Sequence, residues 1–357
     1  MSADPDLLTG VRDFLEKRLS LSDLSAMLQS GAWDRRFLAD FEEFGWSQLG
    51  AGVDRDGLGI PLPELGELMM LIGERLAPGP LAEQLLLSAL IPLPLSVSGQ
   101  AMTMAFADPA ITVDWREESG SLILRDGRLS GTVGLVRHAP HADYLVLAVD
   151  PTVASRAAVI LLALPDPAVA VTELASSDPT ASYGVVTVTD RPTGAEQLVA
   201  SDSEAVELLS RLRSWSRIFT AGELAGIASR VLSDSVDYVQ QRRQFGRPVG
   251  SFQAVKHILA DMATRSASLN ALVMATLHDA HTASVAELEL ASWTLKAYAA
   301  RCGRQVCEDG LQVHGGIGFT EDHHLHWFIR RALALRTWYG DDRELAELIG
   351  LHRLGAA

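Results

Sequence analysis

The chain has 357 residues, of which 48% are hydrophobic and 21% charged, enough apolar material for the cores of two or three globular domains. Its formal net charge of −15 argues against a non-specific nucleic-acid-binding surface, because such surfaces neutralise phosphates with an excess of Lys and Arg. The first residues have neither the basic nor the apolar region of a signal peptide, and no apolar stretch is long enough to span a bilayer, so we expect a cytoplasmic protein that binds neither nucleic acid nor membrane.

Residues 1–100 carry a helical pattern. Apolar residues recur at a spacing of three and four, as in Val11, Phe14 and Leu15, which is the period of a helix with one buried face. Glycine and proline interrupt the pattern near 45, 57–59 and 78–80, and such residues end helices. The sequence therefore predicts an N-terminal helical domain over residues 1–100.

Residues 101–200 have a different pattern. Short β-rich runs at 122–124, 144–147 and 185–188 are separated by Asp-Gly and proline turns, a combination typical of strands and hairpins. The run from Ala157 to Leu164 is apolar throughout and stops before a proline, which indicates a buried strand. We expect a middle antiparallel β domain here.

Residues 201–357 return to the helical period in longer segments. Leu224, Ile227 and Val231 mark one helix, and further helices follow with short links, which predicts a helical bundle. Cys302 and Cys307 are too few for a disulfide framework and are expected to be reduced and buried. No Gly-x-Gly-x-x-Gly follows a predicted strand, so a Rossmann-type dinucleotide site is not supported.

The segment 238–257, at the end of the first long helix, combines groups that suit a phosphorylated ligand. Arg242 offers a planar, permanently charged group that matches a pyrophosphate. Phe245 offers a flat apolar face, Gly246 permits a sharp turn, and Gln253 begins the next helix. For each residue taken alone, helix capping or packing is the favoured interpretation.

The segment 312–331 is the second specific combination. Gln312 offers an amide to a phosphate or ribose oxygen, and Gly315 and Gly316 let a ligand approach the backbone closely. Glycine caps of a helix are the alternative interpretation for this segment taken alone. The two segments in this order favour a nucleotide-binding site.

Together, the two segments resemble the acyl-CoA dehydrogenase family. The resemblance implies an α+β fold with an N-terminal helical domain (1–100), a middle antiparallel β domain (101–200) and a C-terminal four-helix bundle (201–357). It also implies FAD as cofactor, held across a subunit interface, with one subunit binding the flavin ring and its neighbour the ADP part. The residues that the resemblance assigns to this ADP-binding part, called the donated half below, are Arg242, Gln244, Phe245, Gln253, Gln312, Gly315 and Gly316.

The part that would hold the flavin ring departs from the family pattern. The family's leucine-threonine-glutamate-proline segment corresponds to 105–109, where the threonine position is Ala107, and the glycine-serine loop that should follow is absent. The tryptophan and the hydroxyl residue that would face the ring correspond to Leu135 and Arg137. The resemblance therefore implies that a guanidinium occupies space near the ring position.

The catalytic base is also missing from its expected positions. In the family a buried glutamate removes the α-proton of the acyl thioester while a hydride passes to the flavin. The resemblance places Tyr339 there and Ser216 at the alternative position, and an ordinary phenol is a poor base at neutral pH. Glu223 would lie about 10 Å further along the helix, too far to substitute. Asp341 replaces a cofactor-contacting threonine, and no catalytic residue is predicted.

Three histidines, His323, His324 and His326, follow the glycine pair. Adjacent histidines on a helix point apart, and no acidic or cysteine partner stands at metal-site spacing. We therefore expect no metal.

Retention of the donated half with loss of the ring half and base favours a non-catalytic subunit that completes the FAD site of a homologous partner. An α2β2 assembly with the acyl-CoA on the partner is expected, and an electron-transfer flavoprotein is the family's usual electron acceptor. The pattern resembles the degenerate subunits of actinobacterial heterotetrameric enzymes that act on steroid side-chain CoA thioesters. Two alternatives stay open: a competent homotetrameric acyl-CoA dehydrogenase, and a flavin-free structural or regulatory paralogue.

Overall fold

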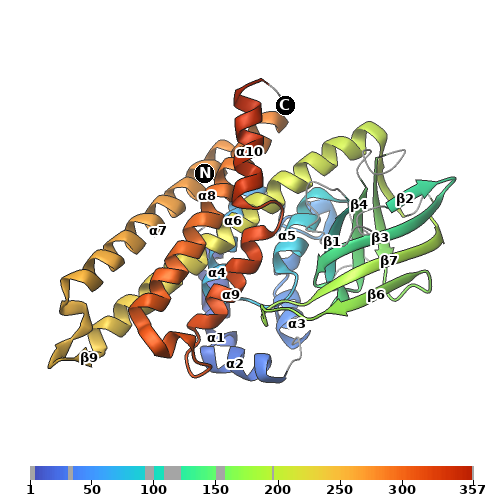
Figure 1. The fold of residues 1–357 in the computed structure, drawn as a ribbon. Coiled ribbons are helices and arrows are strands. Elements are labelled where there is room, and N and C mark those ends of the chain that lie inside the picture. Colours follow the sequence, from blue (N-terminus) through green and yellow to red (C-terminus); the bar gives the residue numbers. More distant parts are fainter. Residues whose placement is uncertain are drawn as a thin grey trace.

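A computed structural model of the chain describes residues 5–30, 35–92, 100–107, 122–149, 157–194 and 197–355. Within these ranges a helical segment comes first, strands follow, and long helices end the chain. The strands of the middle segment lie on one side of the molecule and the long helices extend to the other (Figure 1). This order confirms the predicted α+β fold class, whereas the limits of the three domains stay a prediction.

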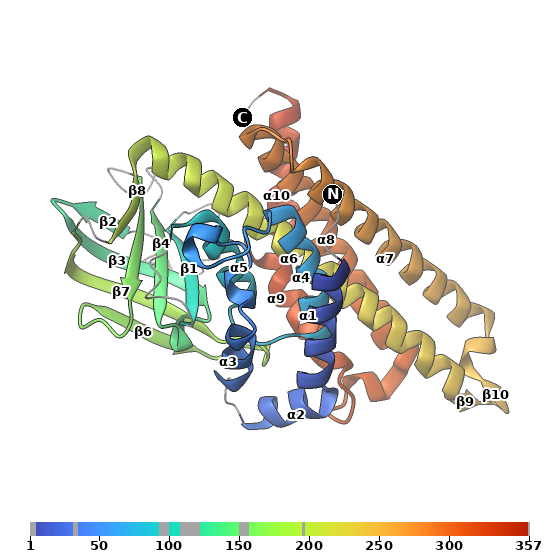
Figure 2. The same ribbon diagram turned by 180° about the vertical axis from the view of Figure 1, so that it is seen from behind.

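The N-terminal segment is helical, as predicted. Its helices are α1 (Pro5–Arg18), α2 (Leu21–Ser30), α3 (Arg35–Glu43), α4 (Leu62–Arg75) and α5 (Leu81–Leu90). Helix α4 packs closely on the first long helix because glycines stand at the contact: a Cβ at Gly226 would lie 1.9 Å from the Met70 carbonyl oxygen. Figure 2 shows α1 and α4 together against the long helices.

The middle segment forms two four-stranded sheets. The first has the order β1 (Met102–Ala107), β4 (Tyr144–Val149), β5 (Ala158–Ala163) and β8 (Leu198–Ser201), and the second β2 (Leu122–Arg125), β3 (Arg128–Arg137), β7 (Tyr183–Pro192) and β6 (Val169–Leu174). Pairing is antiparallel as expected except between β1 and β4, which run parallel. The apolar run from Ala157 supplies the buried strand β5.

The C-terminal segment is the predicted bundle. It contains α6 (Asp202–Gln241), α7 (Gln253–Asp279), α8 (Val285–His314), α9 (Leu325–Thr337) and α10 (Asp342–Arg353). Capping boxes start α8 at Ser284 and α10 at Asp341. Cys302 and Cys307 are free and buried in α8, as predicted. In the described part of the chain, no helix combines the length and the apolar character that crossing a membrane requires.

Candidate functional site

A two-stranded hairpin follows α6 and displays part of the donated half. Strands β9 (Arg243–Gln244) and β10 (Arg247–Pro248) pair so that Phe245 and Gly246 form the turn. Their φ angles are +53° and +79°, the combination that a type I′ turn needs. A phenylalanine with positive φ is strained, and this one is 91% exposed. The hairpin therefore holds an aromatic ring largely in solvent, with an edge-on contact to Phe252 at 6.1 Å between the ring centroids.

The remaining residues of the first segment lie beside this turn. Arg242 is the C-cap of α6, and Gln253 is the first residue of α7. Both side chains are exposed, as is that of Gln244. A hydrogen bond from the Val249 amide to the Arg242 carbonyl oxygen, 2.8 Å long, closes the connection between the two helices. Figure 1 places β9 at the end of the bundle that lies away from the sheets.

The glycine pair lies at the C-terminus of α8. Gly315 has a φ of +66° and caps the helix, and η6 (Gly315–Phe319) follows. A Cβ at Gly315 or Gly316 would meet nothing within 4 Å, so open space adjoins this backbone, and Gln312 is exposed next to it. The Tyr238 hydroxyl donates to the His314 carbonyl oxygen at 3.2 Å. This contact ties the end of α6 to the end of α8, so the two segments share one end of the bundle.

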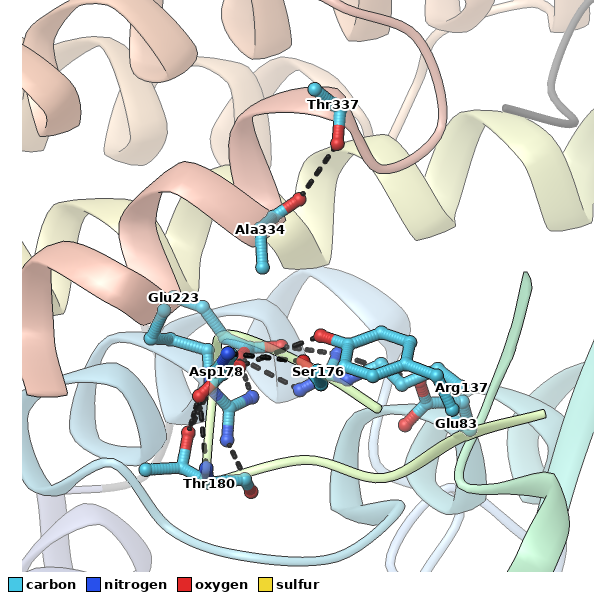
Figure 3. Close-up of polar contacts among 10 residues, drawn as sticks. Glu83, Arg137, Ser176, Asp178, Thr180, Glu223, Ala334 and Thr337 are labelled. Atoms are coloured by element: carbon cyan, nitrogen blue, oxygen red, sulfur yellow. Dashed lines mark hydrogen bonds and ion pairs between the residues drawn. The ribbon is translucent and has the colours of Figure 1, made fainter. Parts of the chain in front are cut away.

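Arg137, by contrast, is buried between two carboxylates. Its Nη1 lies 3.4 Å from Glu83 Oε1 of α5 and 3.2 Å from Glu223 Oε1 of α6. A second contact joins Arg137 Nη2 to Glu223 Oε2 at 3.2 Å. All three residues are at most 3% exposed, and Figure 3 shows them in one cluster. The guanidinium thus joins the N-terminal helices, the sheets and the bundle.

Arg331 of α9 extends this cluster. Its Nη1 lies 3.4 Å from Glu223 Oε2, and its Nε lies 3.2 Å from Asp178 Oδ2. The same side chain donates to the hydroxyl of Thr180 at 2.7 Å and to its carbonyl oxygen at 3.0 Å. We call Glu83, Arg137, Asp178, Glu223 and Arg331 the junction cluster.

The junction cluster has three carboxyl groups and two guanidinium groups. Burial raises the pKa of Glu83, the charge of Arg137 opposes that rise, and the charge of Glu223 adds to it. A protonated Glu83 would leave two carboxylates against two arginines. The cluster can therefore be neutral overall without any ligand, which limits the cost of burying its charges.

Tyr339 lies against the same cluster. Its ring packs edge-on against Phe106, with 5.7 Å between the centroids. Burial, helped by the nearby Glu83 carboxyl group, raises the pKa of the Tyr339 phenol. Arg217 Nε donates to the Tyr339 carbonyl oxygen at 3.0 Å, and Lys296 Nζ donates to the Gly340 carbonyl oxygen at 3.0 Å. These bonds hold the turn in which the family would carry its base, and the phenol in it is neutral.

Little space remains where the resemblance would put ring and substrate. Arg137, Ser216 and Tyr339 all line a cavity of about 10 Å³, which admits about one water molecule. Ser216 instead donates to the Leu212 carbonyl oxygen of its own helix at 2.7 Å. Leu135 lies nearby on β3 with a φ of +49°. A flavin ring or an acyl chain does not fit this cavity.

Some expectations for the ring half lie beyond the structure. Asp108, Pro109 and the residues that would replace the glycine-serine loop are outside the described residues, as is the side chain of Ala107. No group of three or more His, Cys, Asp or Glu that could hold a metal occurs within the described ranges. Of the three histidines considered as metal ligands, His324 contacts Asp234, with 2.8 Å between Nε2 and Oδ2.

The residues that sequence reasoning missed are Glu83, Asp178 and Arg331, together with the role of Glu223. The expectation for Glu223 was only that it lies too far along the helix to replace the base. In the structure its carboxylate lies between Arg137 and Arg331, so it is not free to accept a substrate proton. Arg331 stands inside a segment singled out for other reasons, and nothing in the sequence marks its distant partners.

Comparison with known proteins places this geometry in a family. The model of the acyl-CoA dehydrogenase C-terminal domain matches residues 208–352. The acyl-CoA dehydrogenase FadE27 of Mycobacterium tuberculosis is 31% identical over 295 residues, which are 78% of this chain and 76% of that protein. With other curated relatives, at 38% and 37% identity, the chain matches only 34% and 40% of their length.

Solved structures agree in fold over nearly the whole chain. A chain of the ChsE4–ChsE5 complex from M. tuberculosis superposes with a TM-score of 0.86 at 24% identity, covering 99% of this chain and 97% of that one. A variant of the Tcur3481–Tcur3483 steroid ACAD gives a TM-score of 0.85 at 21% identity, covering 98% of both. These matches show that the chain shares its fold with both structures. The chain belongs to the acyl-CoA dehydrogenase family.

Proposed function

We propose that this chain is the non-catalytic subunit of a hetero-oligomeric, FAD-dependent acyl-CoA dehydrogenase. It would donate the ADP-binding half of a site whose flavin ring and catalytic base belong to a homologous partner. One contrast carries the proposal: the donated half is open to solvent, whereas the position of the ring and base is filled by the junction cluster and Tyr339.

The residues at the end of the bundle fit the ADP part of FAD. Arg242 is exposed and offers two-pronged hydrogen bonds to a pyrophosphate, and the open backbone at Gly315 and Gly316 leaves room for a ligand. Phe245 is exposed and has a strained backbone with a positive φ, and the apolar face of its ring is available to a nucleotide or to the partner. FAD supplies the hydride acceptor in this family, and the residues of this chain would bind and orient only its nucleotide end.

The residues at the junction do not fit the flavin ring. A cavity of about 10 Å³ between Arg137 and Tyr339 would have to open by the volume of a tricyclic ring. Opening it would separate Arg137 from Glu83 and Glu223, and buried charges without partners are strongly destabilising. The absence of a carboxylate base at Tyr339 is consistent with this closure. We therefore place no catalytic residue in this chain.

The substrate and partners follow from the family and its neighbours. The reaction of the whole enzyme would be the α,β-dehydrogenation of an acyl-CoA thioester held by the partner, with a steroid side-chain CoA as the proposed class. Two observations favour a two-chain assembly of this kind: one structural neighbour comes from a ChsE4–ChsE5 complex, and another is named a steroid ACAD of two components. We propose an α2β2 arrangement, with an electron-transfer flavoprotein as electron acceptor.

Co-expression with a full-length homologue from the same genome tests the proposal. The expected product is a heteromer with one FAD per pair of unlike chains and dehydrogenase activity on an acyl-CoA. An active homo-oligomer of this chain with stoichiometric FAD would instead support the competent homotetramer. A heteromer whose flavin is unaffected by changes in the donated half would support the flavin-free structural or regulatory role.

A further inference from the structure

Four aromatic side chains link the two parts of the donated half. Tyr238 and His314 stack with 4.4 Å between their ring centroids. His323 lies next, 4.8 Å from His314, and stacks on His324 at 4.5 Å. We call Tyr238, His314, His323 and His324 the imidazole stack. It runs from α6, one turn before Arg242, past the end of α8 to the start of α9.

Polar contacts fix both ends of the imidazole stack. His324 Nε2 lies 2.8 Å from Asp234 Oδ2, and Asp234 in turn accepts from Arg230 Nε at 2.8 Å. Next to Tyr238 at the other end, His314 Nδ1 lies 2.8 Å from the Gly310 carbonyl oxygen, so Nδ1 carries the proton. His314 is 4% exposed, and its Nε2 has no hydrogen-bond partner among the described residues. The neutral tautomer of His314 is thereby fixed.

His323, in the middle, is held in its neutral form by geometry. The Leu325 amide donates to His323 Nδ1 at 3.2 Å, so protonation of Nδ1 would remove a hydrogen bond at the first residue of α9. A cation there would also face the positive end of that helix. The groups around His323 are His314 on α8, Asp234 and Tyr238 on α6, and His324 and His326 on its own side.

Burial lowers the pKa of His323 to about 4 from 6.5, with the neighbouring His324 and His314 acting in the same direction and Asp234 against it. Burial also lowers the pKa of His314. The unfolded chain therefore takes up a proton at His323 at a higher pH than the folded chain does. The stability that the neutral ring contributes is complete above pH 6.5 and is lost as the pH falls toward 4.

We propose that the imidazole stack is a positioning device that sets the Phe245 hairpin and the Gly315–Gly316 turn at the distance a flavin nucleotide requires, and that acid releases the nucleotide by charging the stack. This inference rests on the proposed function. The stack contributes ring contacts and neutral tautomers, and it touches no reacting atom. Like charges on rings 4.5–4.8 Å apart would repel, and the two ends of the stack would separate.

Three variants of His323 in the heteromeric complex separate ring stacking from the other roles of this side chain. His323→Phe keeps the ring and cannot titrate, His323→Asn keeps an acceptor for the Leu325 amide without a ring, and His323→Ala keeps neither. The readout is the FAD dissociation constant at about pH 8, where an ordinary histidine is neutral, and at about pH 4, where His323 titrates.

At the higher pH we expect His323→Phe to bind FAD nearly as well as the unmodified complex, and His323→Ala and His323→Asn to bind it about five- to tenfold more weakly, the change for one lost aromatic contact. On acidification the unmodified complex should lose FAD and His323→Phe should retain most of it. Rescue by Asn but not by Phe would overturn the positioning role. Equal loss of FAD in acid by the unmodified and Phe complexes would overturn the pH response.

Two further measurements separate this inference from the proposed function. Arg242→Ala in the same complex should weaken FAD binding whether or not the stack matters, so an unaffected Arg242→Ala complex would refute the proposed function itself. A histidine NMR titration of the chain alone needs no partner, and it should show His323 titrating near pH 4. Titration of His323 near its ordinary value would overturn the proposed response to acid.

Discussion

The hairpin end of the bundle and the junction between the bundle and the sheets differ in how their charged and aromatic groups are exposed. At the hairpin, Arg242 and Phe245 face solvent, and Phe245 is held in a strained backbone conformation. At the junction, Arg137 and Arg331 both contact Glu223, and the cavity that Arg137 lines has room for about one water. The paired guanidinium and carboxyl groups of the junction are not available to a ligand, whereas the exposed side chains at the hairpin are.

The largest expected effect is a loss of folding stability when the junction cluster is disrupted. Arg137→Ala leaves Glu83 and Glu223 buried with one cation fewer, and removing one partner from a buried ion pair typically costs about 3–5 kcal/mol. Urea unfolding of the chain should show a loss of this size. Arg128→Ala is the matched control, because this exposed arginine on the same strand pairs only at the surface with Asp190, and it should change stability little. Similar effects of both variants would mean that the junction cluster does not hold the fold together.

The next largest effect is expected on FAD retention, when residues of the donated half are changed. Arg242→Ala in the heteromeric complex removes a charge-assisted contact of about 1.5–3 kcal/mol to the pyrophosphate, and FAD should be retained about tenfold less well or worse. Phe245→Ala should also weaken retention. Equilibrium dialysis against FAD measures both, with Arg128→Ala as a control far from the hairpin. Unchanged retention in both variants would show that the donated half is wrongly assigned.

A smaller effect distinguishes the carboxylates within the junction cluster. Because the pKa of Glu83 is raised, the stability linked to its proton is complete below pH 4.5 and is lost as the pH rises through the folded value. Glu83→Gln keeps a neutral group there, so its unfolding free energy at neutral pH should stay within about 1 kcal/mol of the original or exceed it. Its stability should also fall less between pH 4.5 and 8.

Glu223→Gln is the contrast for Glu83→Gln. Glu223 contacts both Arg137 and Arg331, so its loss should be strongly destabilising at neutral pH. Urea midpoints of the two variants over a pH series make the comparison. Equal losses for Glu83→Gln and Glu223→Gln would contradict the charge balance described for the cluster.

Much of this contrast could be predicted from the sequence, and the rest could not for physical reasons. The helical period and the β-rich runs are local patterns, and they predicted the fold class. The assignment of Arg242 and Gly315 to the donated half follows from the resemblance to the family and stays a prediction. Arg137 and Tyr339 depart from the family pattern, and they predicted a guanidinium near the ring position and the loss of the catalytic base. The junction cluster depends on contacts such as Arg137 with Glu83 and Arg331 with Thr180, which are 54 and 151 positions apart. The spacing of residues within a short segment gives no information on contacts between such distant positions.

The direction of strand pairing was also beyond the sequence. The run at 144–147 has the composition of a strand, but composition does not show which strand it pairs with or in which direction, so the parallel β1–β4 pair was not predicted. The imidazole stack was missed for a related reason. His323 and His324 were weighed as metal ligands together with His326, whereas their partners Tyr238 and Asp234 come from another helix.

The smallest effect is expected at Tyr339. If this chain takes no part in the chemistry, Tyr339→Phe in the complex should leave turnover nearly unchanged, because the phenol serves packing and is not ionised at neutral pH. Tyr339→Glu should not create a second active site, and it should destabilise the chain by placing a carboxyl group beside Glu83. Steady-state rates with FAD content checked in parallel give the answer. A large loss of turnover in Tyr339→Phe with flavin intact would point to a shared active site.

The central claim is that one chain combines an open nucleotide half with a closed ring half, and the flavin content of the chain purified alone tests it most directly. Each site in a homo-oligomer would pair a sound donated half with a filled ring position. After incubation with excess FAD and removal of unbound flavin, the chain should be colourless and inactive on acyl-CoA. A yellow protein that retains one FAD per chain and dehydrogenates an acyl-CoA would contradict the account.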